Sequence, residues 1–131
     1  MTRPARMVVV GDVITDVVAV LSGPLAAGSD TGAAISLGGG GQAANTAAWI
    51  AAQRVDVTLV GAVGDDDAGR DRVAELERAG VDCAIERIDG APTGTVIVLA
   101  ELATGHHYRV AVDADGSVLG YAGLAGVPPD E

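Results

Sequence analysis

Residues 38–47, GGGGQAANTA, join a short apolar run at residues 34–37 to an alanine-rich segment that extends to residue 54. The apolar run predicts a strand, and the segment behind it, which lacks Gly and Pro, predicts a helix. Glycines at such a junction let a ligand approach the backbone closely, and the first N–H groups of a helix have no intrahelical partners. The sequence therefore predicts a small-molecule site here, with Asn45 as a polar group one turn inside the helix.

The composition of the chain limits the kinds of molecule that it can bind and the cellular compartment in which we expect it. The 131 residues fit one domain, and a hydrophobic content of 49% is ample for a core. A net charge of −10 argues against nucleic acid and against an anionic membrane, because both need a basic face. Cys83 is the only cysteine, so no disulfide forms within the chain, and we expect a cytoplasmic location. No apolar run is long enough for a signal peptide or a membrane span.

The remaining pattern around this junction alternates strands and helices. Strands are predicted at residues 7–10, 13–21, 34–37 and 57–60, and helices at residues 42–54 and 68–79. Asp66 or Asp67 is expected to cap the second helix, which ends at Gly80. This order predicts an α/β fold with a parallel sheet and right-handed crossovers.

The pattern changes after Gly80. Residues 84–88, 95–102 and 107–112 are strand candidates with no helix between them. Together with residues 13–37 they predict a small β-strand lid attached to the main sheet. The chain ends on Pro128-Pro129-Asp130-Glu131, which is typical of the start of a helix.

Several motifs in order resemble the ribokinase-type, or PfkB, family of carbohydrate kinases. They are GDVITD at residues 11–16, GGQAANTA at 40–47, VTLVGAVGDD at 57–66, Gly69, GVD at 80–82 and PTG at 92–94. The match covers about residues 7–110, and the ordered set is more specific than any single motif. Arg54 departs from the family pattern, which has Gly or Ser there, and we expect the change to cost a helix C-cap.

The resemblance implies a ribokinase-like fold and an ATP-dependent phosphotransferase with a sugar or nucleoside-like alcohol as substrate. It places the substrate on Asp16, Gly40, Gly41 and Asn45, with Gln42 as an additional contact. The family is about twice as long as this chain, and its catalytic Asp and most of its ATP and Mg²⁺ site lie in a C-terminal half. Residues 1–131 are therefore expected to form the N-terminal substrate-binding part, with no catalytic and no metal-binding residue. A homodimer through the lid or an exposed sheet edge is a further expectation.

Two other functions remain open from the residues. One is a truncated, non-catalytic module that binds a sugar or mediates association, because half of a parallel sheet leaves an unpaired edge. The other is a dinucleotide-binding fragment, because residues 38–43 satisfy the pattern G-x-G-x-x-A. That pattern should be followed by an acid at the end of the next strand, where we expect Gly61. A phosphate-binding loop would need a lysine, and the chain has none.

Overall fold

The computed structural model describes residues 5–112 and 118–124. In chain order its elements are β1 (Arg6–Val10), β2 (Ile14–Leu21), β3 (Ala33–Gly40), α1 (Gln42–Ala52), β4 (Asp56–Gly64), α2 (Asp67–Arg78), β5 (Asp82–Ile88), β6 (Thr95–Glu101), β7 (His106–Val112) and β8 (Val118–Leu124). They form two compact units. We call Met1–Thr15 with Gly39–Gly94 the helix unit, and Asp16–Gly38 with Thr95–Glu131 the strand unit.

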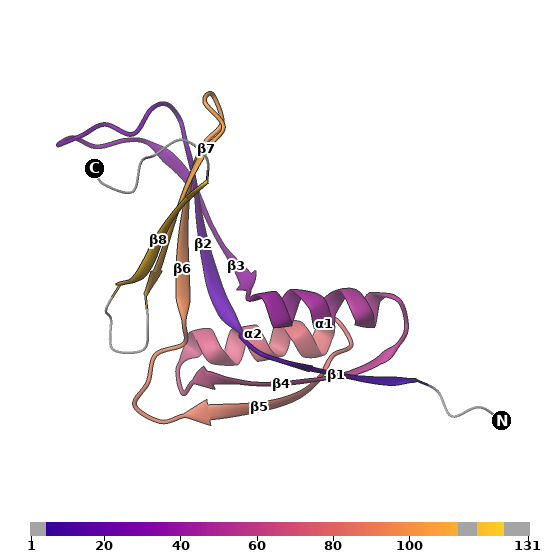
Figure 1. Cartoon of the computed structure of the whole chain (residues 1–131). Helices are drawn as coiled ribbons and strands as arrows, with labels where there is room; N and C mark the ends of the chain where they lie inside the picture. Colours follow the sequence, from indigo (N-terminus) through magenta and orange to yellow (C-terminus); the bar gives the residue numbers. More distant parts are fainter. Residues whose placement is uncertain (1–4, 113–117, 125–131) are drawn as a thin grey trace. The chain divides into compact units, whose positions relative to one another are not determined.

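The helix unit contains a three-stranded parallel sheet in the order β1-β4-β5, and both helices lie on one face of it (Figure 1). Right-handed crossovers place successive helices on the same face when the strands are added in one direction. The core lies between the helices and this face, where Leu59 and Ala47 are completely buried. Ala43 and Ala44 are buried beside them, so small side chains let α1 pack closely on the sheet. The predicted α/β fold with a parallel sheet is confirmed.

One part of the predicted lid is wrong. Residues 84–88 were expected to belong to it, but β5 pairs in parallel with β4, with Cys83 opposite Leu59 and Ile85 opposite Gly61. Cys83 and Ile85 pack against the helix-unit core. The reason is that α2 serves as the crossover from β4 to β5, so β5 completes a second β-α-β unit.

The strand unit is a five-stranded sheet in the order β3-β2-β6-β7-β8. β6, β7 and β8 are antiparallel neighbours, and Gly105 (φ +72°) makes the turn between β6 and β7. β8 falls in a part of the sequence for which no element was predicted. The expected helix start at residues 128–131 lies outside the described residues.

A buried carboxylate connects two loops of the strand unit. Glu101, with 8% of its side chain exposed, accepts hydrogen bonds from the Leu25 N–H (2.9 Å) and the Thr104 hydroxyl (2.9 Å). The Leu25 and Thr104 hydrogen bonds, in that order, lower the pKa of Glu101. The contact fixes the 22–32 loop to the turn that follows β6.

The residues that follow the two helices differ in how well they fit the backbone conformation there. Arg54, two residues beyond the end of α1, has φ +61°, a left-handed conformation that glycine adopts without steric cost. α2 ends at Arg78 and is followed by Gly80 (φ +91°), the glycine predicted to stop it, and Asp66 caps its N-terminus by accepting the Gly69 N–H at 2.8 Å. The expected loss of a good C-cap at Arg54 is therefore visible in the backbone.

Replacing Arg54 by Gly should stabilise the protein by about 1 kcal/mol, because the strain of a side chain in the left-handed region disappears. Chemical denaturation of the Arg54→Gly variant measures the change. Gln53→Gly is the matched control, since Gln53 (φ −84°) has right-handed backbone and should gain nothing. A gain in the control equal to that of Arg54→Gly would contradict the explanation.

Asp66→Ala should destabilise the protein by about 2 kcal/mol, because the cap on α2 and two hydrogen bonds from Thr93, one from its N–H and one from its hydroxyl, are lost together. Asp67→Ala is the control: the Asp67 side chain is 94% exposed and, among the residues that the structure describes, pairs only with Arg70, which predicts a change of at most about 0.5 kcal/mol.

The same carboxylate predicts a pH dependence. The Thr93 hydrogen bonds hold the pKa of Asp66 below its usual value of 3.8. Its contribution to stability is therefore complete above pH 3.8 and is lost as the pH falls through the lower folded pKa. Urea denaturation at several pH values between about 2 and 6 measures this effect. As the pH falls, the free energy of unfolding should decrease less in Asp66→Ala than in the wild type.

Candidate functional site

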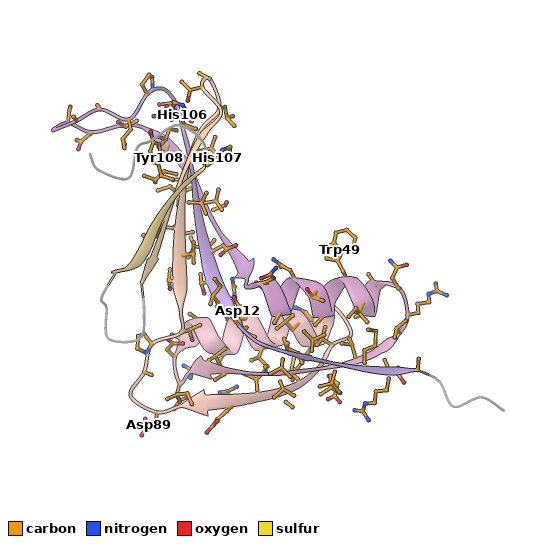
Figure 2. All side chains as sticks on the ribbon, in the orientation of Figure 1. Asp12, Trp49, Asp89, His106, His107 and Tyr108 are labelled. Atoms are coloured by element: carbon orange, nitrogen blue, oxygen red, sulfur yellow. The ribbon has the colours of Figure 1, made fainter. Side chains whose placement is uncertain are left out.

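The N-terminus of α1 is capped by a residue distant in sequence. The Ala43 N–H donates to the Asp12 carboxylate (3.1 Å), and the Ala44 N–H donates to the Asp12 carbonyl oxygen (3.2 Å). Gly41, the residue at the N-cap position, has no side chain with which to do this. Asp12 follows β1 directly, and Figure 2 shows it near the first turn of α1. The carboxylate also complements the positive end of the helix dipole.

Two glycines here are required by close packing of backbone. Gly41 has φ +102°, and a Cβ on it would lie 2.5 Å from the Asp12 carbonyl oxygen. A Cβ on Gly61 would lie 2.4 Å from the Gly11 carbonyl oxygen. Gly41 is buried, so the packing of β1 against α1 is one reason for glycine at this position, beside the ligand access expected from the sequence.

The structure weakens the dinucleotide hypothesis for a reason that the sequence did not indicate. β4 continues beyond Gly61 to Gly64, so an acid, Asp65, does follow that strand. However, dinucleotide folds bind the pyrophosphate at the helix N-terminus, and here the Asp12 carboxylate already accepts a hydrogen bond there. A negative charge at this place repels phosphate.

A pocket of about 180 Å³ lies within the helix unit, between α1, α2 and the end of β3. Its lining residues are Val13, Gly39, Gly40, Ala44, Asn45, Ala48, Arg72, Glu75, Leu76 and Ala79. Sites for whole drug-sized ligands usually measure about 300–1,000 Å³, so this volume fits one part of a ligand. Asn45, Arg72 and Glu75 supply the polar side chains.

The predicted site residues of the helix unit divide between two sides of the first turn of α1. Gly40 and Asn45 line the pocket described above. Gln42 is exposed and lines a second, shallower hollow with Asp12 and Thr46. Of the predicted residues in this unit, Gly40 and Asn45 therefore share one cavity, and Gln42 lies at another.

Asp16 belongs to the strand unit, where it lies near the start of β2. Its Oδ1 atom is buried and accepts no hydrogen bond from the described residues. Nearly all buried polar atoms in proteins have a partner, so an unpaired carboxylate oxygen is a candidate for binding a ligand.

Arg72 and Glu75 were not singled out in the sequence. Both are on α2, and Arg72 Nη2 donates to Glu75 Oε1 at 2.8 Å. Arg72 is nearly buried, with 9% of its side chain exposed, whereas Glu75 is 41% exposed. Their spacing of three residues is a signal for an ion pair on a helix, but it does not indicate that the pair is buried.

Two classes of site find no support in the part of the chain that the structure describes. No group of three or more His, Cys, Asp or Glu side chains is arranged to hold a metal ion there. Asp66 in the run Asp65–Asp67 is accounted for as a helix cap. Within the same residues, no helix is both long enough and apolar enough to cross a membrane.

Comparison with known proteins adds family information to this geometry. Residues 4–117 match the model of the pfkB family carbohydrate kinases. An ATP-dependent ribose-1-phosphate kinase from Halopiger xanaduensis is 40% identical over 94 residues, which are 71% of this chain and 29% of that protein.

Solved structures agree in fold. Ribokinase from Giardia lamblia superposes with a TM-score of 0.73 at 25% identity, over 83% of this chain and 33% of that one. Ribokinase from Arabidopsis thaliana, in complex with ribose and ATP, gives a TM-score of 0.71 at 27% identity, over 87% of this chain and 37% of that one. The chain thus has a ribokinase-like fold and spans about a third of the length of these relatives.

Gly41→Ala should destabilise the protein by at least about 2 kcal/mol, since the new Cβ meets a backbone oxygen in a strained conformation. Gly28→Ala is the matched control: Gly28 also has positive φ (+67°) but nothing within 4 Å, so only the conformational cost of about 1 kcal/mol remains. Thermal melts of both variants make the comparison. Equal losses would show that close packing at Gly41 contributes nothing.

Proposed function

Because the chain belongs to the pfkB family of carbohydrate kinases, we propose that it forms the sugar-binding part of an ATP-dependent kinase. The acceptor is a hydroxyl group of a sugar or of a nucleoside-like alcohol. The observation that carries the proposal is the pocket at the end of β3, in which Asn45, Arg72 and Glu75 supply polar side chains in a largely apolar lining. Its size and its mixture of donors and acceptors suit part of a hydroxylated ligand.

In this proposal the predicted residues have distinct roles. The Asn45 amide donates to one sugar hydroxyl and accepts from another, because a hydroxyl and an amide both do each. Asp16, whose buried oxygen lacks a partner among the described residues, accepts from hydroxyls and fixes the orientation of the sugar. Gly40 and Gly41 bring backbone groups close to the ligand, and Gln42 adds a contact from the first turn of α1.

The strand unit would serve as the lid. Closure of a lid over the acceptor excludes water, which strengthens the electrostatic interactions of phosphoryl transfer and limits hydrolysis of the donor. The Glu101 contact would keep the 22–32 loop in a fixed conformation during this movement.

The described residues do not fit a nucleoside triphosphate or its metal ion. The chain has no lysine, and the N-termini of α1 and α2 already carry the Asp12 and Asp66 carboxylates. We therefore assign to this chain the binding and orientation of the acceptor, and no step of the transfer. The general base and the contacts to ATP and Mg²⁺ would come from other residues of the kinase.

The names of the relatives support this class of substrate. The Halopiger relative is an ATP-dependent ribose-1-phosphate kinase, and the Arabidopsis structure contains ribose and ATP. A pentose or pentose phosphate is accordingly the first acceptor to test. A cytoplasmic location is part of the same proposal.

A non-catalytic association module is the second candidate, and one observation favours it. β1 is an edge strand among the described residues, and Val8 and Val10 on it are 63% and 73% exposed. Exposed apolar edges of this kind favour pairing with another chain. Light scattering distinguishes a stable homodimer through this edge from a monomer.

Asn45→Ala should weaken binding of the acceptor by about tenfold or somewhat less, because a sugar hydroxyl loses a hydrogen-bond partner on the pocket lining. The measurement is KM for ribose and for ribose 1-phosphate in a polypeptide that contains this chain and transfers phosphate from ATP. Gln53→Ala, at the exposed end of α1, is the control and should leave KM unchanged. Unchanged KM in Asn45→Ala would refute the assigned role.

A further inference from the structure

The Arg72–Glu75 pair lies at the polar end of the helix-unit pocket. Arg72 Nε and Nη1 are buried and have no hydrogen-bond partner among the described residues, while Nη2 donates to Glu75. An unsatisfied buried donor costs about 1–3 kcal/mol. The buried guanidinium of Arg72 is therefore costly for the stability of α2.

The geometry explains what this arrangement achieves. Arg72 is anchored in the interior, and its Nη2 donates to Oε1 of Glu75, so the arginine fixes the orientation of the Glu75 carboxyl group. The other oxygen, Oε2, lies 2.9 Å from the position that a Cβ on Gly39 would take, and no hydrogen bond from the described residues reaches it. Gly39 thus leaves space for this oxygen at the pocket wall.

The chemistry of the pocket favours a neutral, hydroxylated group. Asn45 on α1 and Glu75 on α2 line the same cavity, so an amide and a carboxylate oxygen are both available to one ligand. The charges of Arg72 and Glu75 cancel, so the pair gives the pocket no net positive charge with which to attract a phosphate or a carboxylate ligand. Adjacent sugar hydroxyls can donate to Glu75 and exchange hydrogen bonds with Asn45.

We propose that Glu75 is a further sugar-binding residue, which accepts a hydrogen bond from a hydroxyl of the acceptor, and that Arg72 is the positioning residue that orients it. The proposal rests on the proposed function and deepens it, because it adds α2 to the residues that recognise the sugar. Gly39 becomes a specificity-determining position, since any side chain there displaces the carboxylate.

Two adjacent glycines provide a matched test. Gly39→Ala places a methyl group 2.9 Å from Glu75 Oε2, whereas Gly38→Ala places one with nothing within 4 Å. Neither glycine has positive φ, so alanine causes no backbone strain at either position. Gly39→Ala should weaken ribose binding at least about tenfold, the fold-change expected when a hydrogen bond to a charged group is lost. Gly38→Ala should bind as the wild type does.

Substitution of the pair itself gives a second measurement. Glu75→Gln keeps one oxygen, which the Arg72 donor retains, and puts an NH2 donor in place of Oε2 at nearly the same volume, so it should weaken ribose binding to a similar extent. Glu77→Gln, exposed on the same helix, is its control. Arg72→Lys keeps the positive charge and should retain more affinity for ribose than Arg72→Met. If Arg72 only filled space, the two variants would have the same affinity.

The experiment is an amide-detected NMR titration of the 131-residue chain with ribose and, separately, with inorganic phosphate. We expect ribose to shift Gly39, Glu75 and the Nε–H resonance of Arg72, and phosphate to leave them unchanged. Ribose shifts confined to Asn45 and Gln42, or equal affinities of Gly38→Ala and Gly39→Ala, would refute the proposal and leave the proposed function standing. Shifts of Arg72 with phosphate alone would also refute it. No binding of ribose by the wild type would contradict the sugar-binding function itself.

Discussion

The helix unit depends on the close passage of the residues after β1 beneath the start of α1. The Asp12 carboxylate and carbonyl oxygen both accept N–H groups of α1, and the approach is close enough that Gly41 can carry no side chain. The first strand is therefore fixed to the first helix by two hydrogen bonds, and the polar side chain of Asn45 is placed beside the pocket as a consequence. The Asp12 carboxylate already complements the positive end of the α1 dipole, so a ligand bound here does not have to supply a negative charge.

A second constraint positions α2. Asp66 caps that helix and also accepts two hydrogen bonds from Thr93, whose hydroxyl accepts the Gly64 N–H at 3.0 Å. One carboxylate thus joins the end of β4, the start of α2 and the segment before β6. Since Arg72 and Glu75 are further along α2, their position at the pocket follows from this contact. The hydrogen bonds that stabilise the start of α2 therefore also set the position of Arg72 and Glu75.

The sequence was sufficient for the elements whose signal is local. Hydrophobic runs and an alanine-rich helix predicted the parallel sheet, and Asp66 and Gly80 marked both ends of α2. It failed where partners come from distant segments. Nothing near β5 shows that it pairs with β4, and nothing near Asp12 shows that it caps a helix thirty residues later. The burial of Arg72 is equally non-local, because a spacing of three residues is common to exposed ion pairs and buried ones.

The distribution of charge in the helix unit limits what it can bind. Asp12 at α1, Asp66 at α2 and Glu75 at the pocket are all acceptors, and the charge of Arg72 at the pocket is balanced by Glu75, to which its Nη2 donates. Such a surface suits a ligand that donates hydrogen bonds, as sugar hydroxyls do, and it repels the phosphates of a nucleotide. In a sugar kinase the acceptor and the triphosphate must meet without exchanging sites. Of these three carboxylates Glu75 lines the pocket, whereas Asp12 and Asp66 cap the helices, so under the proposed function Glu75 is the one that would disfavour the triphosphate in the acceptor site.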